Sequence, residues 1–231
     1  MVDINDEQMN DLEYEIALII DKRTYFQYYF SLLKKKQIIL FSFYPNKDYN
    51  SQIIKSFLFF FFFTSDMAIN SLFFTDDTMH KIYIDSGSFN IVYQLPQIIY
   101  SYLISSGINF IIEFLSLSED IIISIKEGNM YIKQRKKKIY YMKLKFCFFF
   151  IITFLLLLIF GFYISCFCCI YQNTQLHLIK DSLLSFGISL LYPIFISLIP
   201  GIFRIPALNN KKSGTHFYMY NLSKFIEFLN L

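Results

Sequence analysis

The sequence predicts an all-α, polytopic membrane protein with about four transmembrane helices and an N-terminal interfacial helix. Three observations lead to this fold class. Of the 231 residues, 55% are hydrophobic and only 17% are charged, whereas an ordinary soluble domain has about 25% charged residues. The apolar residues gather in runs long enough to cross a bilayer core of about 30 Å. Lysine and arginine are concentrated in alternate connections between these runs, which is the pattern that the positive-inside rule describes.

The region before the first apolar run, residues 1–55, is expected to form a cytoplasmic or interfacial helical region. Acidic residues come early in this region and lysines come late, at 34–36, which suits the dipole of a helix. Aromatic patches at 25–30 and 38–44 flank those lysines. This combination is typical of a helix that lies along the inner membrane surface. A re-entrant segment at 38–44 is the lesser alternative, because so short a stretch cannot span a bilayer.

The first span is expected at 56–75, although this segment contains Asp66. A carboxylate near the centre of a helix costs about 2.5–3.5 kcal/mol on the insertion scale, whereas each Leu, Ile or Phe returns about 0.3–0.6 kcal/mol. Eleven such residues lie between Phe57 and Phe74, and together they return about 3–6 kcal/mol on the same scale. Because this gain offsets the cost of one Asp, the segment is still predicted to span.

Three further spans follow from apolar runs without charged residues. The clearest is 146–171, and the last is 182–203, which is bounded by Asp181 and Arg204. The remaining span, 90–112, is the most polar of the three because it contains glutamines and several serines. All three are long enough for a helix to cross the hydrocarbon core.

The distribution of positive charge predicts the orientation. Along the chain, the five regions outside the spans hold 7, 1, 8, 1 and 4 lysines and arginines. This alternation requires an even number of spans with both termini in the cytoplasm. The transmembrane region is therefore expected at 56–206, with a basic cytoplasmic loop at 116–145 and a cytoplasmic tail at 207–231.

A candidate intramembrane polar site lies on the first two predicted spans. Asp66 and Asn70 are four residues apart and therefore share a helical face. The connection between these two spans is short, so Gln94, Gln97 or serines of the second span are the expected partners of the carboxylate. A carboxylate inside a membrane commonly marks a cation or proton pathway. The alternatives are a structural hydrogen bond to a neighbouring helix, or a span shifted so that Asp66 nears the outer interface.

Prolines in the last predicted span indicate a bend in its helix. A proline inside a helix removes a backbone hydrogen bond and kinks the helix. Pro193 and Pro200 are seven residues apart, about two turns, so both kinks bend the same face. Together with Gly201, Pro200 is expected to end or break the helix. This favours either a hinge that lines a cavity or packing around neighbouring helices.

Basic side chains next to the membrane are predicted to contact anionic lipid headgroups on the cytoplasmic side, at about 1 kcal/mol for each residue. The expected contacts are Lys133, Arg135, Lys136, Lys137, Lys138 and Arg204. The net charge of +3 gives no global basic field for nucleic acid. The expected partners are therefore the lipid bilayer and other membrane subunits, with no nucleic acid.

No cofactor, metal ion or catalytic residue is expected. Cys166, Cys168 and Cys169 with His177 fit no zinc spacing, and they are interpreted as helix-packing residues. A disulfide is the alternative if this end faces an oxidising lumen. Cys147 is a candidate for acylation. The sequence contains no Ser-His-Asp set, HExxH motif or Gly-rich phosphate loop, so a non-enzymatic protein is predicted.

Several distinctive phrases occur together between Asp11 and Leu208. They include "DLEYEIALIIDKRTYFQYYFSLLKKKQ", "SFNIVYQLPQIIYS", "CIYQNTQLHLIKDSLLSFGISLLYP" and "IPGIFRIPAL". With these phrases the chain resembles a family of multi-spanning membrane proteins of single-celled eukaryotes that has no assigned activity. The resemblance implies a membrane protein and adds no mechanism. Members can carry this region near the C-terminus of a longer chain, so the resemblance is compatible with a fragment.

Two functions follow from these features. The first is a non-enzymatic membrane anchor or assembly subunit. The second is a channel or transporter component that uses the Asp66–Asn70 face and the kinked last span. A void shared by Asp66, Gln94 and Pro200 would favour the second function, whereas an Asp66 that faces headgroups would oppose it.

Overall fold

The computed structural model describes residues 6–45, 48–84, 91–127, 131–209 and 214–229. Within these ranges all regular structure is helical and no strand occurs, which confirms the predicted all-α class. The chain divides into two compact units. One unit, here called the terminal unit, combines Met1–Lys47 with Leu190–Leu231, and the other, the bundle unit, is Asp48–Ser189.

The N-terminal half of the terminal unit forms several short helices where the sequence predicted a single interfacial helix. These helices are α1 (Asp6–Asp11), α2 (Tyr14–Ile20), α3 (Tyr25–Lys36) and α4 (Ile38–Phe43). Polar side chains fix the breaks between them. Thr24 and Gln27 form a capping box that starts α3, and the side chain of Gln37 accepts a hydrogen bond from the Leu40 amide and starts α4.

The C-terminal half of the terminal unit consists of α11 (Leu198–Asn209) and α12 (Gly214–Leu229). Its core joins both ends of the chain, because Ala17 of α2 packs with Ala207 and Tyr220. Gly201 lies where α11 meets the Tyr25 ring, and a Cβ at this position would come within 2.7 Å of a ring carbon. The glycine is therefore explained by this close approach.

The bundle unit contains the remaining helices. They are α5 (Gln52–Leu72), α6 (Asp76–Ile84), α7 (Ile91–Ser116), α8 (Glu119–Glu127), α9 (Ile132–Ile170), the 3₁₀ turn η1 (Gln172–Thr174) and most of α10 (Gln175–Ile196). The predicted outer connection after the first span contains α6, and residues 85–90 lie outside the described ranges.

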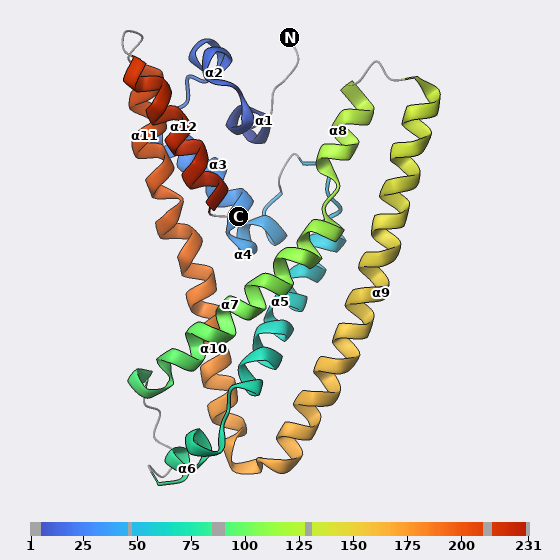
Figure 1. The fold of residues 1–231 in the computed structure, drawn as a ribbon, viewed down its shortest axis with the longest axis vertical. Coiled ribbons are helices and arrows are strands. Elements are labelled where there is room, and N and C mark those ends of the chain that lie inside the picture. Colours follow the sequence, from blue (N-terminus) through green and yellow to red (C-terminus); the bar gives the residue numbers. More distant parts are fainter. Residues whose placement is uncertain (1–5, 46–47, 85–90, 128–130, 210–213, 230–231) are drawn as a thin grey trace. The chain divides into compact units, whose positions relative to one another are not determined.

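Helices α5 and α7 run antiparallel (Figure 1). Before the start of α5, the side chain of Asn50 accepts a hydrogen bond from the Ser118 amide at 3.2 Å, just beyond the end of α7. Near the other end of α5, Asn70 accepts a hydrogen bond from Gln97, which lies in the first half of α7, at 3.4 Å. Contacts at both ends show that α7 accompanies α5 along its length.

Helix α9 runs parallel to α5, and α10 runs antiparallel to it (Figure 1). Ring centroids are 5.7 Å apart for Phe57 and Phe149 near the start of α5, and 5.6 Å apart for Phe74 and Phe167 near its end. On α10, Phe186 contacts Phe63 at 5.2 Å, and Ser182 contacts Asn70 further along α5. The four long helices therefore alternate in direction along the chain.

Among the described residues, three helices are long and apolar enough to cross a membrane: α5, α9, and α10 with its continuation α11 as Gln175–Asn209. This is fewer than the four predicted from the sequence. The predicted span 90–112 forms the helix α7 but does not belong to this set. Helix α7 carries Gln94, Gln97, Asn109 and Glu113 besides its serines.

The helices extend beyond the predicted spans. Helix α9 begins at Ile132, so the C-terminal part of the expected basic loop is helical. Helix α10 begins at Gln175, and the last predicted span therefore starts too late. The helix is interrupted at Ser197 rather than at Pro200. Pro200 lies in the first turn of α11, where its missing N–H removes no intrahelical hydrogen bond.

Candidate functional site

Polar residues at four-residue spacing line one face of three helices in the bundle unit. Helix α5 contributes Asp66 and Asn70, α7 contributes Gln97, Ser101 and Ser105, and α10 contributes Asp181 and Ser185. All of these side chains are buried. Because a four-residue spacing places side chains on one helical face, the three stripes meet inside the unit. This group, together with Ser182, is called the bundle site below.

Asp66 is held by two serine hydroxyl groups from different helices. Ser105 of α7 and Ser185 of α10 both donate hydrogen bonds to Oδ1 of Asp66, at 3.1 and 3.0 Å. The residue is only 3% exposed. Its second oxygen, Oδ2, has no hydrogen-bond partner among the described residues. The carboxylate is therefore oriented through one oxygen while the other is free.

Asp181 repeats this arrangement with an amide donor. Nε2 of Gln97 lies 3.4 Å from Oδ2 of Asp181 and 3.4 Å from Oδ1 of Asn70. Nδ2 of Asn70 in turn lies 3.5 Å from Oγ of Ser182. Asp181 is 0% exposed, and its Oδ1 has no partner among the residues described. These long contacts are weaker than ordinary hydrogen bonds, so this carboxylate is poorly compensated.

Further buried polar atoms extend two of the stripes. Oε1 of Gln94, Nδ1 of His177 and Oγ of Ser65 have no hydrogen-bond partner in the described part of the chain. Gln94 lies three residues before Gln97 on α7, and His177 lies four residues before Asp181 on α10. Buried polar atoms without partners are uncommon in folded proteins, and each one needs an explanation.

The charge of the two aspartates is not balanced by a basic side chain. Among the described residues, no hydrogen bond or ion pair joins a lysine or arginine to Asp66 or Asp181. The bundle unit does contain an ion pair, between Lys55 and Asp48, but this pair lies at the start of α5. No group of three or more His, Cys, Asp and Glu side chains that could hold a metal ion occurs within the described ranges.

The structure brings together three of the four residues of the predicted polar site, namely Asp66, Asn70 and Gln97. Gln94 is buried on the same helix, but its Oε1 bonds to none of them. A serine of the second span contacts the carboxylate, as the sequence analysis expected. Pro200 belongs to the terminal unit and not to this site.

The contribution of α10 to the bundle site was not predicted from the sequence. Asp181 was interpreted as the boundary of the last span, although it lies well inside α10. The signal was present in the sequence, because His177, Asp181 and Ser185 follow one another at four-residue spacing. A charged residue usually marks the end of an apolar run. Asp181 was therefore expected to end the span, and its four-residue spacing with His177 and Ser185 was not recognised.

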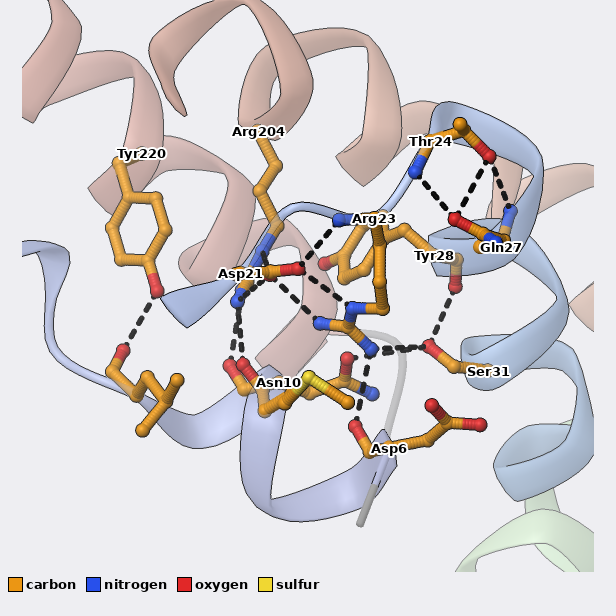
Figure 2. Close-up of polar contacts among 12 residues, drawn as sticks. Asp6, Asn10, Asp21, Arg23, Thr24, Gln27, Tyr28, Ser31, Arg204 and Tyr220 are labelled. Atoms are coloured by element: carbon orange, nitrogen blue, oxygen red, sulfur yellow. Dashed lines mark hydrogen bonds and ion pairs between the residues drawn. The ribbon is translucent and has the colours of Figure 1, made fainter. Parts of the chain in front are cut away.

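Arg204 was predicted to contact lipid headgroups, and the structure contradicts this role. Its side chain is 0% exposed and lies inside the terminal unit. Figure 2 shows it paired with Asp21, with Nη2 3.0 Å from Oδ2. It also donates hydrogen bonds to the carbonyl oxygens of Met9 at 2.7 Å and Asn10 at 3.0 Å. The guanidinium is thus fully used by the protein.

Asp21 is shared between two arginines, and aromatic rings enclose the group. Arg23 forms a two-pronged pair with both oxygens of Asp21, at 2.8 Å each. The rings of Tyr28 and Tyr220 lie 4.8 Å from the Arg204 guanidinium carbon. Burial raises the pKa of Asp21, but Arg23 and Arg204 outweigh that effect and hold the pKa below its ordinary value of 3.8. The whole group is called the arginine cluster below.

The other predicted headgroup residues lie in the first turns of α9. Lys133, Lys136 and Lys137 are exposed. Arg135 and Lys138 donate hydrogen bonds to α8, to the Ile125 carbonyl at 3.2 Å and the Ser124 hydroxyl at 2.8 Å. Exposure leaves the first three available to a ligand, and contact with lipid stays a prediction.

The cysteines form no bond with one another in the structure. All four, Cys147, Cys166, Cys168 and Cys169, are free. Cys147 and Cys169 are exposed, and the other two are half-buried. The acylation of Cys147 stays a prediction.

No model of a known protein family matches the chain, no curated protein matches it, and no solved structure matches it. The family resemblance drawn from the sequence phrases therefore also stays a prediction.

Proposed function

We propose that this chain is a multi-pass membrane protein that crosses the bilayer four times, with α7 as the fourth span. The direction of the helices supports this count. If α5 and α9 cross in the same direction, the chain must return between them, and α7 is the long helix available. Its 26 residues extend about 39 Å at 1.5 Å per residue, which exceeds a hydrocarbon core of about 30 Å.

Contacts within the terminal unit also support an even number of membrane crossings. Asp21 precedes every candidate span, and Arg204 lies near the C-terminal end of the last one, Gln175–Asn209, yet the two side chains form a buried ion pair. Both ends of the chain therefore belong on one side of the membrane, which requires an even number of crossings. The excess of lysine and arginine in alternate connections assigns that side to the cytoplasm.

Within this topology we assign the bundle a role as a channel or transporter component for a small cation or proton. The observation that carries this proposal is the pair of buried carboxylates, Asp66 and Asp181, each with one free oxygen and no basic partner among the described residues. Burying a carboxylate without compensation is costly. A helix bundle that only anchors another protein gains nothing from this cost, whereas charged residues inside membranes are typical of ion pathways.

Ion flux in proteoliposomes tests this function. Purified protein is reconstituted, and the release of protons, Na⁺ and K⁺ is followed with ion-sensitive dyes. We expect flux of one of these ions, and we expect its loss in Asp66→Asn and in Asp181→Asn. The matched control is Asp76→Asn, which neutralises an exposed carboxylate at the start of α6. Absence of flux for every ion, or full flux in both site variants, would overturn the proposal.

A non-enzymatic anchor or assembly subunit is the second candidate function. It is favoured by an exposed apolar stripe on α12, where Tyr218, Leu222 and Phe225 follow helical spacing. Other membrane subunits are the partners this role implies. Native mass spectrometry of the protein from mild detergent would detect a bound subunit, and Leu222→Gln should release it if the stripe is the contact.

A further inference from the structure

We propose that the bundle site binds protons, at Oδ2 of Asp66 and at Oδ1 of Asp181. This inference rests on the proposed transport function and names the species that is handled. A proton from water forms an O–H bond with the free oxygen, and the carboxylate becomes a neutral carboxylic acid. Release breaks that bond and returns the proton to water, so no other reactant is needed.

The two carboxylates share one pattern, which is the first support for this inference. In each, one oxygen accepts hydrogen bonds from neutral donors, and the other oxygen is buried without a partner among the described residues. Serine and glutamine donors orient the carboxyl group, but hydrogen bonds of this kind are weak in a membrane bundle. They cannot offset the cost of a buried, unpaired charge. Protonation of the free oxygen removes that charge.

The donors at the bundle site disfavour a metal ion. Ca²⁺ and Mg²⁺ take six or more oxygen ligands, and the described residues contain no group of three or more His, Cys, Asp and Glu side chains that could hold a metal. Nε2 of Gln97 points an N–H group toward both Asp181 and Asn70. A bound cation would have to displace this donor before it reached those oxygens.

Independent support comes from acceptors that lie outside the two carboxylates. Oε1 of Gln94 and Nδ1 of His177 are buried without partners in the described chain. They lie on the same helical faces as Gln97 and Asp181. A carboxylic acid is a hydrogen-bond donor, whereas a carboxylate is not. The amide oxygen of Gln94 can only accept a hydrogen bond, and Nδ1 of His177 can accept one in one of the two neutral tautomers, so both atoms suit a site that holds proton donors.

Among the described residues of the four long helices, the buried titratable groups of the bundle site lie on α5 and α10. Helix α5 contributes Asp66, and α10 contributes His177 and Asp181, while Lys180 of α10 is exposed. The facing stripe of α7 carries amides and hydroxyls. The buried side chains of α9 are Phe149, Thr153, Phe160 and Phe167, and none of them titrates.

Infrared spectroscopy of the reconstituted protein tests proton binding directly, because a carboxylic acid has a C=O band that a carboxylate lacks. We expect this band at neutral pH in the natural sequence. Each of Asp66→Asn and Asp181→Asn should remove part of it, and Asp76→Asn should leave it unchanged. Ser105→Ala should shift the Asp66 component without removing it, because only its hydrogen bond is lost. This last variant keeps the test valid if an Asn variant fails to fold.

The band and the ion flux together separate the two proposals. A band with proton flux supports both. A band without flux of any ion supports proton binding and overturns the transport function. Flux of Na⁺ or K⁺ in a protein that lacks the band overturns proton binding and leaves the transport function standing. Loss of the band in Asp76→Asn, with the band intact in both site variants, would also overturn the inference.

Discussion

The terminal unit and the bundle unit both bury aspartate side chains, but they compensate them very differently. Asp21 lies between Arg204 and Arg23 in the arginine cluster. Within the described part of the chain, Asp66 and Asp181 have only neutral donors and one free oxygen each. The same residue type is therefore used in two ways. A compensated carboxylate fixes a structure, whereas an uncompensated one remains chemically available.

The difference also concerns which segments are joined. The arginine cluster connects the first helices of the chain to α11 through charge-assisted hydrogen bonds, which are about twice as strong as neutral ones. In the bundle site, three helices of one unit meet through contacts of 3.0 to 3.5 Å in which every donor is neutral. We therefore expect mutations in the first region to change folding, and mutations in the second to change ion handling.

The largest effect is expected for Arg204→Leu. Removal of one partner from a buried ion pair costs about 3–5 kcal/mol, because the other charge stays buried and unpaired. Asp21 still has Arg23, so we expect the lower part of this range. The free energy of unfolding in mixed micelles measures the loss, and Lys22→Leu at an exposed neighbouring position is the control. If Arg204→Leu costs no more than Lys22→Leu, the charge-pairing explanation is wrong.

The next effect is the response of the terminal unit to acid. The folded-state pKa of Asp21 lies below its ordinary value of 3.8, so ionised Asp21 stabilises the fold above that pH. This contribution is lost as the pH falls through the folded-state pKa. Asp21→Asn should cost about 1.5–3 kcal/mol at neutral pH and should reduce the loss of stability in acid. Cleavage of the N-terminal helices by pepsin at several acidic pH values measures the difference, and identical profiles for both proteins would refute it.

The fold class could be predicted from the sequence because the class depends on the overall composition and on the spacing of apolar residues. Long apolar runs identified α5, α9 and α10, and the tolerance of Asp66 in α5 followed from counting its apolar neighbours. Both results depend on averages over many residues, so single errors do not change them. The boundaries were less accurate, since a charged residue at the end of a run can lie outside the helix or inside it.

The pairing of individual charges could not be predicted in the same way. Arg204 and Asp21 are separated by 183 positions, and nothing in the spacing of either residue indicates the other. The sequence neighbours of Arg204 are those of a residue that binds lipid headgroups, whereas its neighbours in the fold are those of a core residue. Only part of the bundle site was predicted. The Asp66–Asn70 stripe was recognised by its helical spacing. The partner stripe on α10 was not, because the sequence led us to expect Asp181 at the end of the helix.

A smaller effect on folding is expected when the bundle aspartates are changed. Asp66→Asn and Asp181→Asn keep the shape of the side chain and remove an uncompensated charge, so stability should change by less than about 1 kcal/mol in either direction. Reversible unfolding in mixed micelles, alongside the flux assay, measures both properties on one preparation. A loss as large as that of Arg204→Leu would show that these carboxylates are structural, as in the terminal unit.

The smallest effect, and the sharpest test of the comparison, is expected for Ser105→Ala. The variant removes one of two hydroxyl donors to Oδ1 of Asp66 and leaves Ser185 in place. A neutral hydrogen bond in a membrane bundle is worth about 0.6 kcal/mol on average, whereas a bond to a charged group is worth about 1.5–3 kcal/mol. The measured loss therefore reports the charge of Asp66 without changing that residue.

In the background of Asp66→Asn, the cost of Ser105→Ala should stay near the neutral value, which makes the pair of measurements a double-mutant cycle. A coupling energy near zero means that Asp66 is already neutral in the folded protein, as the proton-binding inference requires. A coupling energy above about 1 kcal/mol would place a full charge on Asp66 and contradict the proton-binding inference.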